Sequence, residues 1–228
     1  MAPSGSLDVV EKLLIACDFD GTITRRDTLH IIVEEFGTRG LWDAIAPRLR
    51  AGEVSLEQAM QEEFDSVRAT PGQVRDLVLR AAGLREGFPE FVAWAHDRGH
   101  RLVVFSSGFR SVIEPVLAHW GLGHLPVVSH DAVFSDDGCR LVWSDRGDPC
   151  PECSRRCKRH DLRRHNHGER LVYVGDGVSD LCAAQTADLV FARADLARDL
   201  SAVDVPFVPF EDFVVVREHL ASAASIAA

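Results

Sequence analysis

Positive charge is in short supply in this sequence. The 25 lysine and arginine side chains are outnumbered by 35 aspartates and glutamates, which gives a formal net charge of -10. A negatively charged protein is not attracted in a general way to nucleic-acid phosphates or to anionic lipid. We therefore expect neither a nucleic-acid partner nor a membrane partner, and an anionic substrate would need cations placed locally.

Long apolar runs are missing too. No stretch approaches the roughly 18 apolar residues of a membrane span. The opening segment MAPSGSLDVVEK has neither the basic region nor the apolar region of a secretion signal, and repeats are absent. We expect a cytoplasmic protein, and 228 residues suit one domain or a core domain with a small insertion.

Cysteine occurs six times, but no secretion signal suggests disulfides, so reduced thiols are the default interpretation. Three of the six stand close together, at Cys150, Cys153 and Cys157. Thiols at this spacing are typical ligands of structural Zn²⁺, and His160 or Cys139 could be the fourth ligand. Without a second cysteine pair, reduced thiols in a surface loop fit the sequence equally well.

Apolar runs of strand length alternate with stretches of helical periodicity. The runs predict strands buried on both faces, at residues 12–17, 101–105, 170–174, 188–191 and 205–208. Helical patterns lie at residues 88–98, 109–119, 178–186 and 210–222. The alternation predicts an α/β fold with a doubly wound, Rossmann-like parallel sheet, in which ligands bind beyond the carboxyl ends of the strands.

Residues 27–84 separate the first strand from the helix before the second. Apolar side chains recur at helical spacing over residues 28–36 and 55–64, and Gly52 and Gly83 punctuate the segment. We expect a small helical cap here, inserted into a catalytic core made of residues 1–26 and 85–228. A hairpin is expected near residues 133–143, with its turn at residues 137–138.

Acidic residues follow two of the predicted strands. CDFDGTIT, residues 17–24, carries Asp18 and Asp20, and GDGVSD, residues 175–180, carries Asp176 and Asp180. Carboxylates held close together repel one another unless a cation or a shared proton offsets the repulsion. Mg²⁺ prefers oxygen ligands and is commonly held by one or two carboxylates together with substrate phosphate. The pattern therefore indicates a Mg²⁺ site, although Asp is also common in turns and at helix starts.

Small polar residues follow the strand at residues 101–105. Ser106, Ser107 and Gly108 stand where that strand is expected to give way to a helix, a position at which backbone amides bind anions. A serine N-cap is the simpler interpretation of this segment taken alone.

In order and context, these segments resemble the four motifs of the haloacid dehalogenase (HAD) superfamily: DxDGT after the first strand, Ser after a later strand, a Lys, and GDxxxD. The resemblance implies a Mg²⁺-dependent phosphatase that hydrolyses a small phosphate monoester through an aspartyl phosphate. It makes Asp18 the nucleophile and Asp20 the general acid and base. Asp18, the backbone carbonyl of Asp20, and Asp176 would hold the metal, and Asp180 would complete the acidic cluster.

The same resemblance assigns the phosphate contacts. Ser106 would bind the phosphoryl group, and further substrate contacts would come from Thr22, Ser107 and Gly108. The lysine motif falls on Lys158, because Lys12, which is the only other lysine, begins the first strand at the wrong end.

Two branches of phosphatases share further segments with this chain. SSGFRSVIEPV is similar to the second motif of phosphoserine phosphatases. A closer likeness is to the methionine-salvage phosphatases of 2-hydroxy-3-keto-5-methylthiopentenyl-1-phosphate, and it is carried by CDFDGTIT, LREGFPEFVAWA (84–95), CK (157–158) and DLVFAR (188–193). In the cap, Asp27 and Arg68 are candidates to contact the leaving group. The expected partner is a small phosphorylated metabolite, and the expected state is a monomer or a homodimer.

Two other functions would use similar acids. Carbon–halogen hydrolysis uses an Asp nucleophile without metal, but a proton donor at Asp20 favours phosphoryl chemistry. A phospho-accepting binding module would also pair acids on a doubly wound sheet, but it would carry its acceptor on a middle strand and would lack the cap. The sequence thus favours a phosphatase.

Overall fold

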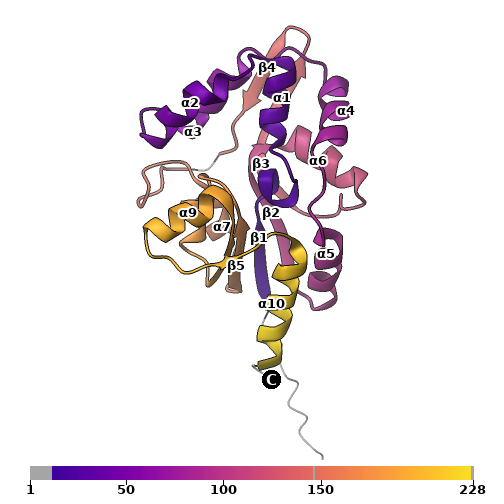
Figure 1. The fold of residues 1–228 in the computed structure, drawn as a ribbon, viewed down its shortest axis with the longest axis vertical. Coiled ribbons are helices and arrows are strands. Elements are labelled where there is room, and N and C mark those ends of the chain that lie inside the picture. The colour runs from indigo at the N-terminus through magenta and orange to yellow at the C-terminus, as the bar shows by residue number, and fades with distance from the viewer. Residues whose placement is uncertain (1–11, 146, 227–228) are drawn as a thin grey trace, which may run out of the picture.

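A seven-stranded sheet forms the centre of the molecule, in the order β4-β3-β2-β1-β5-β6-β7 (Figure 1). The computed structural model describes residues 12–145 and 147–226. All neighbouring strands are parallel except the β3–β4 pair. The strands are β1 (Leu13–Cys17), β2 (Arg101–Phe109), β3 (Val127–Ser135), β4 (Gly138–Val142), β5 (Arg170–Gly175), β6 (Leu189–Ala192) and β7 (Val208–Pro209). The predicted parallel α/β sheet is confirmed.

Helices cover both faces of the sheet, which explains why the strands read as continuous apolar runs. Along β1, Ile15 and Cys17 pack on one face, whereas Leu14 and Ala16 pack on the other. The first face is covered by α5 (Phe88–Asp97), α6 (Arg110–His119) and α10 (Phe213–Ile226). The second is covered by α7 (Lys158–His165), α8 (Leu181–Ala184) and α9 (Ala194–Ala202). No helix in the described residues is long and apolar enough to cross a membrane.

Four helices gather beyond the end of the sheet at which β1 leads into a short turn, η1 (Phe19–Ile23) (Figure 1). They are α1 (Thr28–Phe36), α2 (Leu41–Arg50), α3 (Leu56–Phe64) and α4 (Pro71–Ala81). Side-chain caps define the starts of three of them: Asp27 caps α1, and Ser55 and Thr70 form capping boxes at α3 and α4. A cap satisfies helix amides that otherwise lack a partner.

The end of β2 and the β3–β4 hairpin support α3 and the segment that leads to α4. The ring of Phe64, at the end of α3, lies 4.9 Å from that of Phe109 and 6.3 Å from that of Phe134. The amide of Ala69 donates to the carbonyl oxygen of Ser135 at 3.2 Å. The predicted hairpin is therefore present, although Ser135 pairs with Gly138, which puts the turn at residues 136–137, one position earlier than expected.

Candidate active site

The turn that follows β1 is fixed from both sides. The Asp18 amide donates to the carbonyl oxygen of Val174 on β5 at 2.9 Å. The Arg85 guanidinium donates to the carbonyl oxygens of Gly21 and Thr22, both at 2.6 Å. A buried cation that satisfies several backbone carbonyls holds an irregular turn in one conformation. Sequence reasoning gave Arg85 no role, because its partners lie about 60 positions away.

Gly21 lets the second acidic loop approach the first. Its φ is +76°, and a Cβ there would lie 2.2 Å from Oδ2 of Asp176. The hydroxyl of Thr22 donates to Oδ1 of the same carboxylate at 2.9 Å. Glycine is required both for the left-handed backbone and for the close contact. The two acidic segments therefore meet directly.

Three of the four predicted acids converge. Ligand oxygens of Asp18, Asp176 and Asp180 all lie within 4.8 Å of one another. Asp20 points elsewhere: its Oδ1 accepts hydrogen bonds from the Thr28 amide at 2.7 Å and the Thr28 hydroxyl at 2.5 Å. Its carboxylate thus faces the start of α1 instead of the acidic cluster, which suits proton transfer better than metal ligation.

Lys158 lies inside the acidic cluster and is 1% exposed. Its Nζ donates to Oδ1 of Asp18 and, at 2.6 Å, to Oδ1 of Asp180. Burial by itself would lower the pKa of Lys158, but the two carboxylates outweigh burial and hold the pKa above its ordinary value. The lysine is therefore charged, and it offsets part of the negative charge.

Asp180 is fully buried, and both of its oxygens already have donors. Oδ1 also accepts from the Tyr173 hydroxyl at 2.7 Å, and Oδ2 accepts from the amides of Asp176 and Gly177 at 3.1 and 3.0 Å. These bonds shape the turn after β5 and hold Lys158 in place. Direct metal ligation by Asp180 stays a prediction from the motif.

The acids carry more negative charge than one lysine balances. Burial, and next the charge of Asp180, raises the pKa of Asp18 and also that of Asp176, the latter to about 6. Three carboxylates and one ammonium leave an excess of negative charge that a divalent cation would balance. Because all the donor atoms are oxygens, the site suits Mg²⁺. The residues present thus fit the metal that the sequence predicts.

The pKa of Asp20 is also displaced. Burial, followed by the charge of Asp27, raises it to about 7, even though Thr28 donates to the carboxylate. A carboxyl group that titrates near neutral pH can give and take a proton under ordinary conditions.

Ser106, Ser107 and Gly108 do not open a helix, contrary to the sequence expectation. β2 continues through them to Phe109, with an irregular register against β3, and α6 begins only at Arg110. The Gly108 amide donates to Oγ of Ser106 at 2.9 Å. A Cβ at Gly108 would lie 3.0 Å from Oδ2 of Asp20, so this backbone closely lines the acid.

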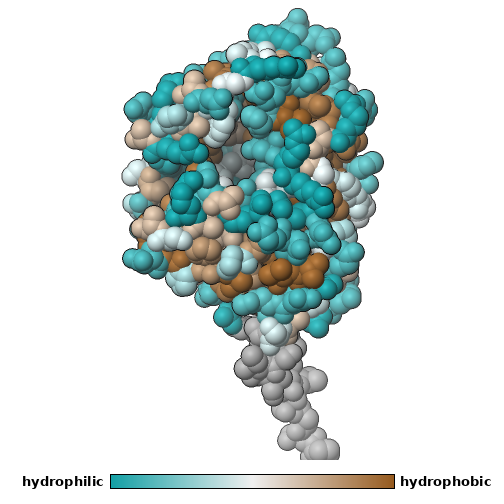
Figure 2. Space-filling model, viewed as in Figure 1, coloured by the Kyte–Doolittle hydropathy of each residue, from teal (hydrophilic) through white to brown (hydrophobic). Residues whose placement is uncertain are grey.

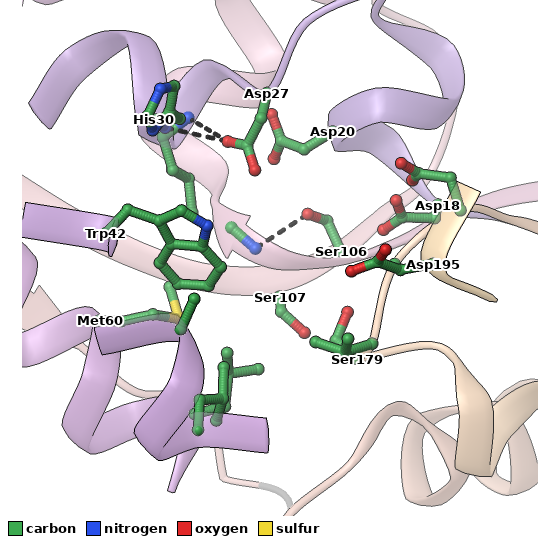
Figure 3. Close-up of a pocket in the computed structure, with 18 of the residues that line it drawn as sticks. Asp18, Asp20, Asp27, His30, Trp42, Met60, Ser106, Ser107, Ser179 and Asp195 are labelled. Atoms are coloured by element: carbon green, nitrogen blue, oxygen red, sulfur yellow. Dashed lines mark hydrogen bonds between the residues drawn. The ribbon is translucent and has the colours of Figure 1, made fainter. Parts of the chain in front are cut away.

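A cavity of about 390 Å³ opens from the acids toward the helices above the sheet. Figure 2 shows a recess in this face, between the sides of the molecule that carry α2 and α9. In Figure 3, Asp18 and Asp20 lie on one side of the cavity and Trp42 and Met60 on the other, with Ser106 between them. The acidic end and the apolar end therefore face a single space.

Glu63 is a lining residue that the sequence did not single out. It is 7% exposed, and no described residue donates a hydrogen bond to its carboxylate. Burial, then the charge of Asp27, raises its pKa to about 7. Only its position in the fold distinguishes it from Glu57 and Glu62, the more accessible glutamates of the same helix.

Two further sequence expectations have different outcomes. Asp27 lines the cavity while its carboxylate caps α1 through the amides of Leu29 and His30. Arg68 does not line it: its Nη1 donates to the carbonyl oxygens of Asp65 and Val67 at 2.7 and 2.9 Å. Its guanidinium therefore supports the chain after α3.

Comparison with known proteins identifies the family to which this chain belongs. The sequence pattern of haloacid dehalogenase-like hydrolases matches residues 15–185. The chain belongs to the haloacid dehalogenase-like hydrolase family. This match confirms the predicted family, and the similar proteins described next confirm the predicted fold and phosphatase class.

Several relatives within this family are similar over nearly their whole length. Proteins named 2-hydroxy-3-keto-5-methylthiopentenyl-1-phosphate phosphatase are 29% identical in Brevibacillus brevis and 31% identical in Geobacillus thermodenitrificans. Each alignment covers 92% of this chain, and it covers 97% and 96% of the relatives. Among solved structures, a substrate-bound phosphoserine phosphatase has a TM-score of 0.70 at 20% identity, covering 92% of this chain and 98% of its own. That likeness supports the fold alone.

We expect replacement of Lys158 to destabilise this HAD protein strongly. Lys158→Ala leaves Asp18 and Asp180 buried without their cation, and breaking a buried ion pair in this way costs about 3–5 kcal/mol. Urea unfolding in buffer without divalent cations measures the loss. Lys12→Ala removes the only other lysine, which is exposed, and should change stability by less than about 0.5 kcal/mol. Equal losses in the two variants would contradict the assigned ion pairs.

Glu63 predicts a specific pH dependence of stability. Its folded-state pKa of about 7 lies above the ordinary value of 4.5, so the folded state binds the extra proton between these values. Protonated Glu63 therefore leaves the folded state at its full stability below pH 4.5. The free energy of unfolding then falls as the pH rises to about 7, because ionising this buried carboxyl destabilises the folded state. Glu63→Gln should remove this loss, so the variant gains stability over the wild type by at most about 3 kcal/mol across that window. The exposed Glu53→Gln is the control, and parallel pH profiles for wild type and Glu63→Gln would refute the assignment.

Proposed function

We propose that this protein is a Mg²⁺-dependent phosphatase that acts through an aspartyl phosphate on Asp18, and that its substrate is 2-hydroxy-3-keto-5-methylthiopentenyl-1-phosphate. The observation that carries the proposal is the meeting of Asp18, Asp20 and Ser106 at the acidic end of one cavity, with Lys158 on Asp18. The relatives of the same name support the choice of substrate.

In the first half of the reaction, a carboxylate oxygen of Asp18 attacks phosphorus. The new oxygen–phosphorus bond forms while the bond to the leaving oxygen breaks, and protonated Asp20 gives its proton to that oxygen. In the second half, Asp20 takes a proton from water, the water oxygen attacks phosphorus, and the Asp18 carboxylate is released with inorganic phosphate. The pKa of about 7 at Asp20 suits both halves.

Phosphatases of this family generally use Mg²⁺. In this chain, Asp18, Asp176 and the backbone carbonyl of Asp20 would hold the ion, and Asp180 would act behind them through Lys158 and the loop amides. When bound, Mg²⁺ supplies positive charge that offsets the carboxylates and the phosphoryl oxygens.

The phosphoryl group would be bound by residues that already surround Asp18. Lys158 supplies a buried ammonium, and Ser106, Ser107 and the Gly108 backbone supply neutral polar groups beside it. Thr22 acts indirectly, because its hydroxyl holds Asp176. Preorganised donors of this kind stabilise charge that develops during phosphoryl transfer.

The far end of the cavity supports an apolar leaving group. It is lined by Leu29, Trp42, Leu49, Leu56 and Met60, with the acids Asp27 and Glu63. Arg50 and His30 are the basic residues among the described lining, and Arg50 already pairs with Asp195 at 3.4 Å. A methylthio chain suits apolar walls, whereas the carboxylate of phosphoserine would face two acids with little positive charge.

We also propose that residues 27–84 act as the cap. The helices α1, α2 and α3 supply every apolar residue named at the far end of the cavity, and these residues face the acids that follow β1. A cap of this kind keeps bulk water from the covalent intermediate. The cytoplasmic location stays a prediction from the sequence.

Phosphate release from three esters tests this proposal. With Mg²⁺, we expect kcat/KM for 2-hydroxy-3-keto-5-methylthiopentenyl-1-phosphate to exceed that for O-phosphoserine by about 100-fold, because apolar contacts discriminate by about 1–3 kcal/mol and misplaced charge adds to this. p-Nitrophenyl phosphate serves as a general substrate, and all rates should fall when Mg²⁺ is removed.

Paired tryptophan variants sharpen the test. Trp42→Ala should lower kcat/KM for the methylthio substrate by about 10-fold or more and leave O-phosphoserine nearly unaffected. Trp120→Ala, which removes a tryptophan outside the cavity lining, is the matched control. Faster turnover of O-phosphoserine would refute the assigned substrate, and no Mg²⁺-dependent release from any ester would refute the proposed function.

A further inference from the structure

Four cysteines meet on the side of the molecule that carries α7 and α8. Cys150, Cys153 and Cys157 come from the segment before α7, and Cys182 comes from α8. All four sulfur atoms lie within 4.8 Å of one another. The sequence had suggested the first three and offered His160 or Cys139 as a fourth. The structure brings Cys182 into that place.

The sulfur positions approach those of a tetrahedral zinc site. With Zn–S bonds of about 2.3 Å, neighbouring sulfurs of a tetrahedron lie about 3.8 Å apart. The Cys150 and Cys182 sulfurs are 3.7 Å apart, and no other pair exceeds 4.8 Å. Small side-chain movements would therefore close the tetrahedron without moving the backbone elements.

The segment before α7 already forms a tight turn of the kind that can present two metal ligands. The Ser154 amide donates to the carbonyl oxygen of Cys150 at 2.7 Å, and the Cys150 amide donates to that of Arg155 at 2.9 Å. Ser154 has a φ of +55°, which turns the chain back after Cys153. Two cysteines separated by two residues around a tight turn are a common half of a structural zinc site.

The surroundings also suit the charge of such a site. Four thiolates around Zn²⁺ carry two net negative charges, and a cation nearby offsets them. Nη1 of Arg159 lies 4.0 Å from the Cys182 sulfur, and its Nη2 lies 3.7 Å from a carboxylate oxygen of Glu152. A cavity of about 140 Å³, lined in part by Cys153, Cys157 and Cys182, gives an ion a path to the thiols.

We propose that Cys150, Cys153, Cys157 and Cys182 bind one structural Zn²⁺ ion. Four protein ligands leave no open coordination position, so the ion does not take part in catalysis directly. Its effect is on position: Cys157 directly precedes Lys158, and Cys182 lies two residues after Asp180. The ion would therefore tie together the two segments whose side chains form the buried Lys158–Asp180 pair.

Metal content of the whole protein tests the proposal without any substrate. The full chain, purified under reducing conditions without chelator, is analysed by inductively coupled plasma mass spectrometry, and we expect about one zinc per chain. Replacing zinc with Co²⁺ should give the thiolate-to-metal absorption and the visible bands of a tetrahedral cobalt site. Zinc removal should lower Tm, because a metal that binds only the folded state stabilises it.

Serine variants identify the ligands. Cys182→Ser and Cys153→Ser should each lose most of the zinc, whereas Cys139→Ser, at a cysteine outside the cluster, should keep it. Cys153 lies in the loop before α7, away from the core, so its variant tests the ligand set even if Cys182→Ser folds poorly. Circular dichroism reports the folding of each variant.

Three results would overturn the inference. The first is a reduced wild-type protein that neither contains zinc nor takes it up on titration. The second is full zinc retention by both Cys153→Ser and Cys182→Ser. The third is a set of disulfides among these cysteines that persists in the protein purified under reducing conditions, found by thiol counting. Each result can be reached whether or not the proposed phosphatase activity holds, so the two proposals fail separately.

Discussion

The contact of the Lys158 ammonium with the carboxylates of Asp18 and Asp180 is the interaction on which the rest of the site depends. Lys158 is nearly inaccessible, so its charge must be balanced within the protein, and the two acids provide that balance. The acids in turn are stable beside one another only because a cation lies between them. One buried lysine thus links the end of β1, the turn after β5 and the start of α7.

The strand order makes this contact reachable. β1 lies between β2 and β5, so the carboxyl ends of the three strands that carry Asp18, Ser106 and Asp176 are adjacent. Gly21 then removes the one Cβ that would separate the first and last of these segments. Arg85 holds the carbonyls of the first turn, so the loop stays in place despite its irregular backbone. The strand order thus brings the acidic segments near one another, and Gly21 and Arg85 allow them to come into contact.

Much of this arrangement could be predicted from sequence, because its signals are local. Continuous apolar runs predicted the central strands. The acids that directly follow β1 and β5 predicted that the site lies at the carboxyl ends of these strands. The parallel part of β3 was missed: residues 127, 128 and 130 pair with β2, but the sequence carries no strand signal for them separate from the hairpin. The role of Arg85, the burial of Glu63 and the approach of Cys182 were missed because each arises from contacts between distant segments.

The errors have a common physical origin as well. Arg68 was a candidate because cap residues often face the site, but the direction of its side chain is decided by nearby carbonyl groups. The expected helix begins at Arg110, one residue after its predicted start, but residues 106–108 do not open it, because β2 extends to Phe109 through an irregular register with β3. Asp20 and Asp18 are two residues apart, yet their carboxylates have different partners: Lys158 for Asp18 and Thr28 for Asp20. Residue type and spacing indicated the chemistry, while backbone conformation decided which group faces which.

The central claim is that Asp18 is the nucleophile held by this network, and the most direct measurement is the hydrolysis rate of Asp18→Asn with p-nitrophenyl phosphate and Mg²⁺. The account predicts a loss of about four orders of magnitude or more with the fold retained by circular dichroism, since the covalent route is removed. Asp43→Asn makes the same change at an exposed position of α2 and should keep the wild-type rate. A folded Asp18→Asn variant that retains a rate within about 10-fold of the wild type, a barrier change of only about 1.4 kcal/mol, would contradict the account.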